Sequence, residues 1–262
     1  MTSISVPRSS SRSNHMHSQI ILVNTWEQVE SACQKIIHSS EGIIAFDLEG
    51  VNLGRNGQLT LLQIAIDQRT VFCFDVLVLG KQLFEHRFLG GIFFSPRIVK
   101  VCFDCRVDGD VLYSHFGVRI NMLYDIQILY TSLFQSRKDP FLKGLRRVLQ
   151  HPDVIQHKGT LEKVIQCKQR IKERLDGSMH HMIFLARPLT PEILEYCSCD
   201  VVYLLRMHAI WSRHDGGSHH ILRATMDRLM RFCTRREAIP PWQMSMVDFS
   251  PPTLKPKHDD AS

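Results

Sequence analysis

The chain has 262 residues with a formal net charge of +6, and 44% of its residues are hydrophobic and 22% charged. That balance fits one globular domain with a buried core, or such a domain with a helical extension, and a core of this size needs no disulfides. No run approaches the roughly 20 apolar residues that cross a bilayer, so we expect no membrane partner. Eight cysteines scattered through apolar stretches favour free, mostly buried thiols in a reducing compartment.

The two ends of the chain differ in composition from its middle. Residues 1–18 are rich in Ser, contain arginine and lack acids, which predicts a disordered tail or, as the alternative, a mitochondrial presequence. Proline pairs predict a flexible tail over residues 239–262. We expect one domain over residues 19–213 and a basic helix over 214–238. Because no secretory signal is visible, we expect an intracellular protein of the nucleus or cytoplasm.

The middle of the chain alternates between short apolar runs and helical patterns before it becomes almost purely helical. Helices are expected after Thr25 and at 81–89, 106–116, 192–211 and 218–236, and strands at 19–23, 42–46, 59–66, 71–74, 98–103 and 120–124. The strands between 42 and 74 are typical of an antiparallel meander. Strands first and helices afterwards predict an α/β domain with a mixed five-stranded sheet, counted from the strand at 42–46, flanked by helices and followed by a helical C-terminal extension.

Basic residues cluster in the C-terminal half, at 137–147, 163–174 and 223–236. Solvated helix faces are the simpler interpretation of these clusters. Few acids lie near them, however, so a surface that binds phosphates is the alternative prediction, and the net charge permits nucleic-acid binding without requiring it.

Two acids, Asp47 and Glu49, follow directly after the apolar run at 42–46. Side chains two positions apart on a strand point to the same face, so these carboxylates converge while Leu48 points to the other face. Carboxylates at an inner strand end are costly unless a positive group compensates them, and a divalent cation is the natural candidate. An Asp-x-Glu triplet is common, however, and by itself more often has no function.

Two further groups of polar residues lie later in the chain. Tyr196 and Asp200 share one face of the helix that follows Pro191, because residues four apart lie on the same side. Three acids follow the strand at 98–103, and a helix start tolerates acids because of its dipole. These acids are Asp104, Asp108 and Asp110. Taken singly, each group is explained as well by ordinary surface residues.

The order of these three motifs resembles that of the DEDDy 3′–5′ exonucleases, the ribonuclease D-like group. Within that group the chain is most similar to the branch that contains Egalitarian and exonuclease 3′–5′ domain-containing protein 1. The resemblance covers about Ile20 to Trp211 and includes flanking residues as well as the acids. These flanks are Leu59–Ala65, Tyr124-Asp125 with Gln127, and Arg187–Leu189. Many members of the family carry His where this chain has Phe103, which is one departure from the pattern.

The resemblance implies a ribonuclease H-like fold and a hydrolase that removes nucleotides from a 3′ end with two Mg²⁺ or Mn²⁺ ions. It implies Asp47, Glu49, Asp108 and Asp200 as metal ligands, with Asp110 as the second choice for the third acid. Hard oxygen ligands of this kind suit a two-ion phosphodiester hydrolase. The resemblance also implies that Tyr196 positions the attacking water, and its ordinary pKa near 10 favours that role over proton removal.

The expected substrate is a single-stranded 3′ end, with RNA preferred by analogy to RNA-processing relatives. Val51 and Leu53 would lie near the terminal nucleotide, although a plain core contact is an equal alternative. Lys143 and Arg146 are expected to contact the backbone. Because only one basic helix and a Pro-rich tail follow Trp211, a protein partner is expected to select the substrate.

Two rival functions remain. Some members of this branch have lost acids and serve as RNA-binding adaptors in larger complexes, but this chain keeps all four acids and the tyrosine, which favours catalysis. A zinc site at Cys102-x-x-Cys105 is the other, and since no second pair follows at finger spacing, buried thiols explain these cysteines better.

Overall fold

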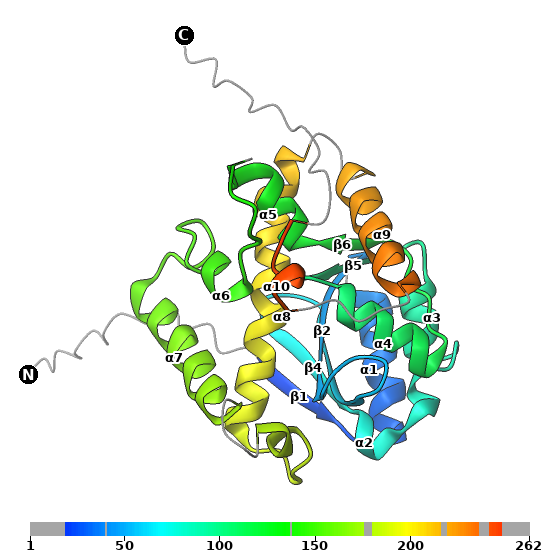
Figure 1. The fold of residues 1–262 in the computed structure, drawn as a ribbon. Coiled ribbons are helices and arrows are strands. Elements are labelled where there is room, and N and C mark those ends of the chain that lie inside the picture. Colours follow the sequence, from blue (N-terminus) through cyan, green and yellow to red (C-terminus); the bar gives the residue numbers. More distant parts are fainter. Residues whose placement is uncertain are drawn as a thin grey trace, which may run out of the picture.

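A mixed sheet of six strands runs through the computed structural model of the protein, which describes residues 19–39, 41–136, 138–175, 180–215, 219–235 and 241–247 (Figure 1). The strands lie in the order β1-β4-β3-β2-β5-β6. Their bounds are β1 Gln19–Val23, β2 Ile43–Val51, β3 Gln58–Ala65, β4 Thr70–Asp75, β5 Val99–Cys102 and β6 Leu123–Asp125. The tail predicted at 1–18 lies outside the described residues.

The strand pairing confirms the predicted mixed sheet but corrects its size. β2, β3 and β4 form the expected antiparallel meander, and β5 and β6 continue the sheet parallel to β2. The predicted count of five strands is one too few, because β1 joins the free edge of β4 in parallel, with Gln19 opposite Thr70. β1 is apolar on both sides: Val23 packs in the core and Ile20 packs beneath the helices of the other face, so pairing with β4 buries it.

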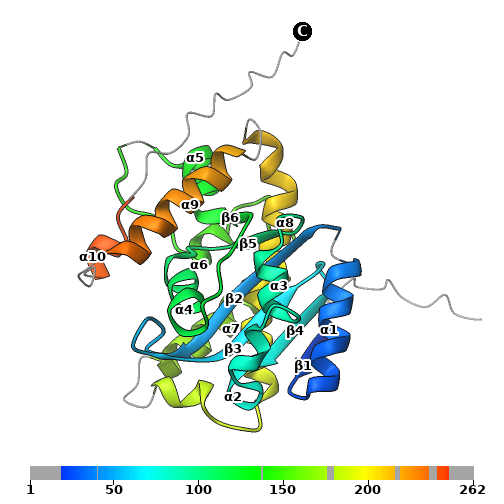
Figure 2. The same ribbon diagram turned by 90° about the vertical axis from the view of Figure 1, so that its right-hand side faces the viewer.

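Helices cover both faces of this sheet (Figures 1 and 2). α8 crosses the strands on one face with α7 beside it, while α1, α3 and α4 lie on the opposite face. The α-helices are α1 Trp26–Ser39, α2 Val76–Leu79, α3 Leu89–Phe94, α4 Arg106–Phe116, α5 Ile126–Phe134, α6 Leu145–Val148, α7 Lys158–Leu175, α8 Pro191–Trp211, α9 His219–Thr234 and α10 Pro241–Met244. Short 3₁₀ turns lie at Lys81–Phe84, His180–Phe184 and Ser212–His214. None of the described helices is long and apolar enough to cross a membrane.

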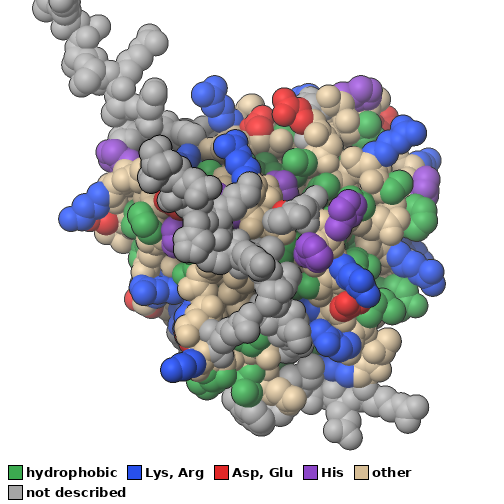
Figure 3. Space-filling model, turned by 90° about the horizontal axis from the view of Figure 1, so that it is seen from above, with side chains coloured by type: hydrophobic (Ala, Val, Ile, Leu, Met, Phe, Trp, Pro, Cys, Tyr) green, Lys and Arg blue, Asp and Glu red, His purple; other side chains and the backbone are tan. Residues whose placement is uncertain are grey.

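α9, the described part of the basic helix predicted over 214–238, packs against α4 and β6. Its Arg228 is fully buried, where it donates to Asp125 and Gln127, so this residue cannot contribute to a basic surface. On the described part of the face in Figure 3, Lys and Arg side chains are spread out instead of gathered in one dense patch. The phosphate-binding surface therefore stays a prediction.

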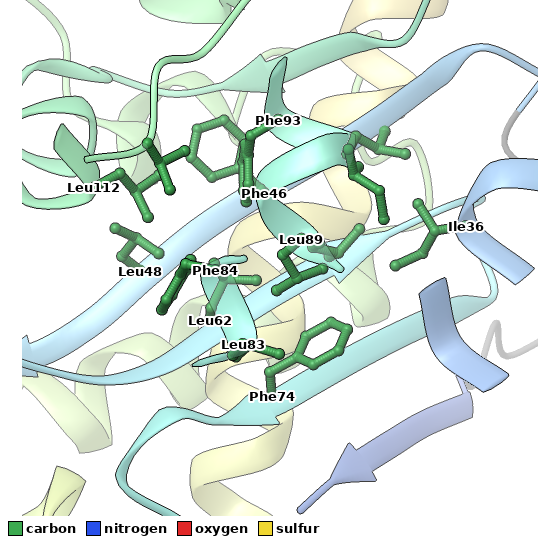
Figure 4. Close-up of a cluster of buried hydrophobic side chains, with 14 of the residues drawn as sticks. Ile36, Phe46, Leu48, Leu62, Phe74, Leu83, Phe84, Leu89, Phe93 and Leu112 are labelled. Atoms are coloured by element: carbon green, nitrogen blue, oxygen red, sulfur yellow. The ribbon is translucent and has the colours of Figure 1, made fainter. Parts of the chain in front are cut away.

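Alternation along β2 decides which side chains reach which face. Ile44, Phe46 and Leu48 point into a cluster formed with α1 and α3, where Phe93 contacts Phe46 edge-on with ring centroids 5.1 Å apart (Figure 4). The intervening Ala45 lies in the cluster on the α8 side. Asp47 and Glu49, which follow Ala45 on the same face of β2, therefore lie under α8.

α8 begins as its sequence predicts. Thr190 caps it by accepting from the N–H of Ile193 at 3.4 Å, and Pro191 occupies the first turn, where no N–H is needed. Arg187, three residues before Thr190, holds the start of α8 against the sheet by donating to Asp75 of β4 at 2.8 Å. The helix is thereby fixed in register over β2 and β3.

Two predicted elements differ from the structure. The helix expected at 81–89 is a 3₁₀ turn over Lys81–Phe84 followed by non-helical residues up to α3, because the backbone leaves the helical region at Glu85 (ψ 154°) and again at Phe88 (ψ −131°). The flexible tail is expected from residue 239, whereas 241–247 include α10 and pair with the segment after α5: Val247 donates to the carbonyl of Pro140 at 2.8 Å.

Candidate functional site

Three carboxylates from distant parts of the chain meet beneath α8. Asp47 and Glu49 lie inside β2, which continues to Val51 and is longer than the strand expected at 42–46, and Asp200 lies in the middle of α8. One oxygen from each acid lies within 4.8 Å of the others. The two β2 acids are half-buried and Asp200 is buried. The structure thus brings together three of the four acids expected to hold metal.

Asp108 lies in the first turn of α4 and is close enough for its charge to act on Glu49, while Asp47 acts on Asp108. Its two neighbours are already paired: Asp104 with Arg106 at 2.7 Å, and Asp110 with Arg55 at 2.9 Å. Within the described part of the chain, the Asp108 carboxylate makes no hydrogen bond or ion pair. This difference favours Asp108 over both alternatives as the fourth acid, a role that stays a prediction.

Negative charge is crowded in this site. Burial, followed by the neighbouring charge of Asp200, raises the pKa of Asp47 to about 8. Burial and then the charge of Asp47 raise the pKa values of Glu49 and Asp108 well above their usual range. One oxygen of Asp200, Oδ2, is buried without a hydrogen-bond partner among the described residues. The cluster therefore has carboxylate oxygens available for a cation.

Lys168 of α7 is a site residue that the sequence motifs do not reveal. Its ammonium forms an ion pair with Asp200 Oδ1, and its side chain is only 11% exposed. It also lies 4.8 Å from the centre of the Tyr196 ring. A signal is present in retrospect, because Lys168 stands four residues after Val164 and three before Ile171, both of which are buried in the inner face of α7.

Tyr196 lies one turn before Asp200 on α8 and is half-buried. Burial, with the charges of Glu49, Asp200 and Asp47, raises the pKa of its hydroxyl. The hydroxyl therefore stays protonated and is able to donate a hydrogen bond. In this setting the side chain can orient a water molecule but does not readily take up a proton.

Gln63 is a second residue that the motifs do not reveal. It lies on β3 directly opposite Asp47, so the two side chains share a face of the sheet. Gln63 is fully buried, and neither its Oε1 nor its Nε2 has a hydrogen-bond partner among the described residues. A glutamine within the apolar run Leu59–Ala65 is the signal that marks it.

The hairpin between β2 and β3 carries the two apolar residues expected near a terminal nucleotide. Val51 is half-buried, and Leu53 packs against the core cluster beneath α1 and α3. Gly50 permits the tight turn away from Glu49, since a Cβ there would lie 2.2 Å from the carbonyl oxygen of Gln58. The core contact expected as the alternative for Leu53 is present, and contact with a base stays a prediction for both residues.

The two basic residues expected to bind substrate make other contacts. Lys143 forms an ion pair with Asp139, and Arg146 donates to Gln169 of α7 at 2.7 Å. Neither contacts the carboxylate cluster. Phe103, which stands where many family members have His, is partly buried against the cluster on the α8 side.

Cys102 and Cys105 approach Asp125 closely enough to suggest a metal site, with ligand atoms within 4.8 Å of one another. The Asp125 carboxylate is, however, already occupied by backbone N–H groups and by Arg228 at 2.9 Å. Burial contributes to raising the pKa values of both thiols, which favours their neutral forms. Buried thiols remain the better explanation.

Comparison with known proteins adds to this geometry. The profile of the family described as "3'-5' exonuclease" matches residues 20–213. The chain is 29% identical over 170 residues to the piRNA biogenesis protein EXD1 of Mus musculus, a match that covers 65% of this chain and 29% of that protein. The chain spans about a third of the length of the curated relatives that it matches.

Two solved structures share the fold. RNase D of Trypanosoma brucei in complex with RNA U12 superposes with a TM-score of 0.71 at 21% identity, over 89% of this chain and 77% of that one. NrnC of Brucella melitensis with bound Mg²⁺ gives a TM-score of 0.56 at 18% identity, over 83% of this chain and 92% of that one. At these identities the likeness shows the fold alone, and it is the ribonuclease D-like α/β fold that the sequence predicts. Together with the family match over most of its length, this means that the chain belongs to the ribonuclease D-like 3′–5′ exonuclease family.

Proposed function

We propose that this protein is a metal-dependent 3′–5′ exonuclease that removes nucleotides from the 3′ end of single-stranded RNA. The observation that carries the proposal is the convergence of Asp47, Glu49 and Asp200 within 4.8 Å. Acidic side chains from separate elements do not usually converge on one position without a ligand, because their mutual repulsion opposes it.

The donor set fits divalent cations such as Mg²⁺ or Mn²⁺. All four candidate ligands are carboxylates, which are the hard oxygen donors that these ions prefer. Asp200 Oδ2, which is buried without a hydrogen-bond partner in the described part of the chain, is one acceptor that such an ion would satisfy. When bound, a pair of ions supplies activation of the attacking water and stabilisation of the leaving oxygen. Asp47, Glu49, Asp108 and Asp200 would hold them.

The remaining roles belong to the side chains around the acids. The protonated Tyr196 hydroxyl would hold the attacking water in line with the scissile bond by a hydrogen bond. Val51 and Leu53, on the hairpin that begins beside Glu49, would contact the terminal nucleotide, and Lys143 and Arg146 its backbone. These roles are proposals that rest on position and on the family pattern.

RNA is the proposed substrate because two relatives are linked to it by name: the RNase D of Trypanosoma brucei was solved with RNA, and the EXD1 protein is named for piRNA biogenesis. A partner protein would select the RNA. The family alone leaves DNA open as a substrate.

The test is shortening of matched 5′-labelled RNA and DNA oligonucleotides with Mg²⁺, with Mn²⁺ and with chelator. We expect a ladder that shortens from the 3′ end of the RNA and needs metal. Asp200→Asn is expected to reduce the rate roughly 1,000-fold, because it weakens the hold on ions that contribute several kcal/mol to the barrier. Glu195→Gln changes an exposed acid on the same helix and should keep the rate. A wild-type protein that leaves the RNA intact both with Mg²⁺ and with Mn²⁺ would overturn the proposal.

A second candidate function is that of an RNA-binding adaptor that cleaves nothing. The observation that favours it is the ion pair between Lys168 and Asp200, which compensates part of the negative charge without a metal. An adaptor would bind the RNA oligonucleotide in a gel-shift assay and leave its length unchanged with Mg²⁺ and Mn²⁺.

A further inference from the structure

Lys168 of α7 forms an ion pair with one of the three clustered acids, Asp200. Its Nζ donates to Asp200 Oδ1, and both side chains are nearly enclosed, with exposed fractions of 11% and 7%. Its charge also acts on Asp47 and Glu49, and among the described residues it is the one cation whose charge acts on both. A positive group thus stands inside the position where a family member would hold metal.

We propose that Lys168 is a built-in counter-ion that competes with a divalent cation for Asp200. This inference rests on the proposed function, since it requires that the acids bind divalent ions. In the metal-free protein the lysine would compensate the charge of Asp47, Glu49 and Asp200. It would withdraw from Asp200 when an ion binds there.

The competition follows from the number of oxygens that Asp200 offers. Oδ1 accepts from the ammonium, and Oδ2 is buried without a partner among the described residues, so an ion using both oxygens would share Oδ1 with Nζ and lie next to its charge. An ion using Oδ2 alone would lie close to a second positive charge in a site that screens charges poorly. Either arrangement weakens metal binding for as long as Lys168 remains on Asp200.

The Lys168 side chain is able to change position while its helix stays in place. Its ammonium ends a flexible four-carbon chain, while the helix beneath is anchored by Val164, Cys167 and Ile171, all buried. Nζ already lies over the Tyr196 ring, 4.8 Å from its centre, and this contact would keep the charge stabilised after Nζ leaves Asp200. The side chain can therefore leave Asp200 without any movement of α7.

Removing the charge should have two opposite effects that a purely structural lysine would not combine. Lys168→Met leaves the crowded acids uncompensated, so the metal-free protein should unfold at a lower temperature. The same change removes the competitor, so Mn²⁺ should bind more tightly and restore the lost stability. A lysine that served only packing would lower stability without any gain in metal affinity.

The experiment is calorimetric titration of Mn²⁺ into metal-free wild type, Lys168→Met, Lys168→Arg and the control Lys163→Met, which changes an exposed lysine on the same helix. Lys168→Met is expected to bind roughly 10-fold to 100-fold more tightly, the range that loss of one competing charged hydrogen bond implies. Lys168→Arg, which keeps the charge, and Lys163→Met should bind no more tightly than wild type. Lys168→Gln is the second variant if the methionine protein does not fold.

The outcomes separate this inference from the proposed function. Equal or weaker binding by the Lys168→Met protein, with wild type still binding Mn²⁺, would overturn the role of Lys168 alone. No binding by any variant would overturn both. Binding by Lys168→Met but not by wild type would support the competition and would instead contradict the nuclease proposal.

Discussion

Asp125 at the end of β6 and Asp47 in the middle of β2 are acids of the same sheet with opposite surroundings. Asp125 is fully buried, yet three backbone N–H groups and Arg228 donate to it. Asp47 instead faces two other carboxylates, with Lys168 as the compensating cation. An acid with a full set of donors belongs to the fold, whereas acids with a shortage of positive charge mark a place for a ligand.

The sharpest test of this comparison is Asp47→Asn. Under the proposed function the rate should fall by roughly 1,000-fold, since Asp47 is one of the acids proposed to hold the ions. The metal-free protein should be as stable as wild type or more so, because one of the repelling charges is gone. Rates on labelled RNA and thermal melts in chelator measure both effects. A strongly destabilised variant would mean that Asp47 is held by the fold, as Asp125 is.

The opposite result is expected at Asp125, the acid that is paired with Arg228. Arg228→Met should lower the free energy of unfolding by about 3–5 kcal/mol, because it leaves the buried Asp125 without its charged partner. Urea unfolding gives this value. Arg231→Met, which changes an exposed arginine on the same helix, should have little effect. Equal stability of the two variants would contradict the structural role assigned to Arg228.

Gln63 tests whether an unpartnered polar group serves the site. Gln63→Met should raise the free energy of unfolding by about 1–3 kcal/mol, because a buried amide without partners is removed at similar volume. A loss of activity in the more stable protein would assign Gln63 to substrate or water. Gln58→Met, at the exposed start of the same strand, is the control. Lower stability of Gln63→Met would show that the amide is satisfied after all.

Lys100 extends the comparison to a buried lysine that no acid accompanies. It donates to the carbonyls of Ser95 and Ile98, both at 2.7 Å, and burial lowers its pKa to about 7. Above that pH the folded protein has lost a proton that the unfolded chain keeps up to about pH 10.4. Stability should therefore rise from about pH 7 to about pH 10, by at most about 1.4 kcal/mol per pH unit. Urea unfolding at several pH values should show this rise in wild type and not in Lys100→Met.

Short-range sequence patterns predicted those parts of the fold that depend on residues close together in the chain. The bounds expected for the helix at 106–116 are those of α4, and Thr190 with Pro191 marked the start of α8. Alternation along β2 was enough to place Asp47 and Glu49 on one side of the strand. In these cases the side chains concerned are neighbours in sequence or one turn apart.

Features that depend on docking were missed or misjudged. The position of Lys168 depends on α7 lying beside α8, and Arg228 is buried only because β6 supplies Asp125 beneath it. β1 was seen as a strand, but nothing in its five residues reveals the edge of β4 as its partner. The helix expected at 81–89 was wrong because the backbone leaves the helical region at Glu85 and Phe88, in a segment whose composition is otherwise compatible with a helix.

The cluster beneath α8 also sets an order of events during synthesis. Asp47 and Glu49 of β2 lie within the first fifty residues of the chain. Tyr196 and Asp200 of α8 are synthesised only after all the strands of the sheet. A ribosome-bound chain that ends before α8 contains every strand but lacks one acid and the tyrosine. The site proposed to bind metal would therefore be complete only once this late helix has docked onto the sheet.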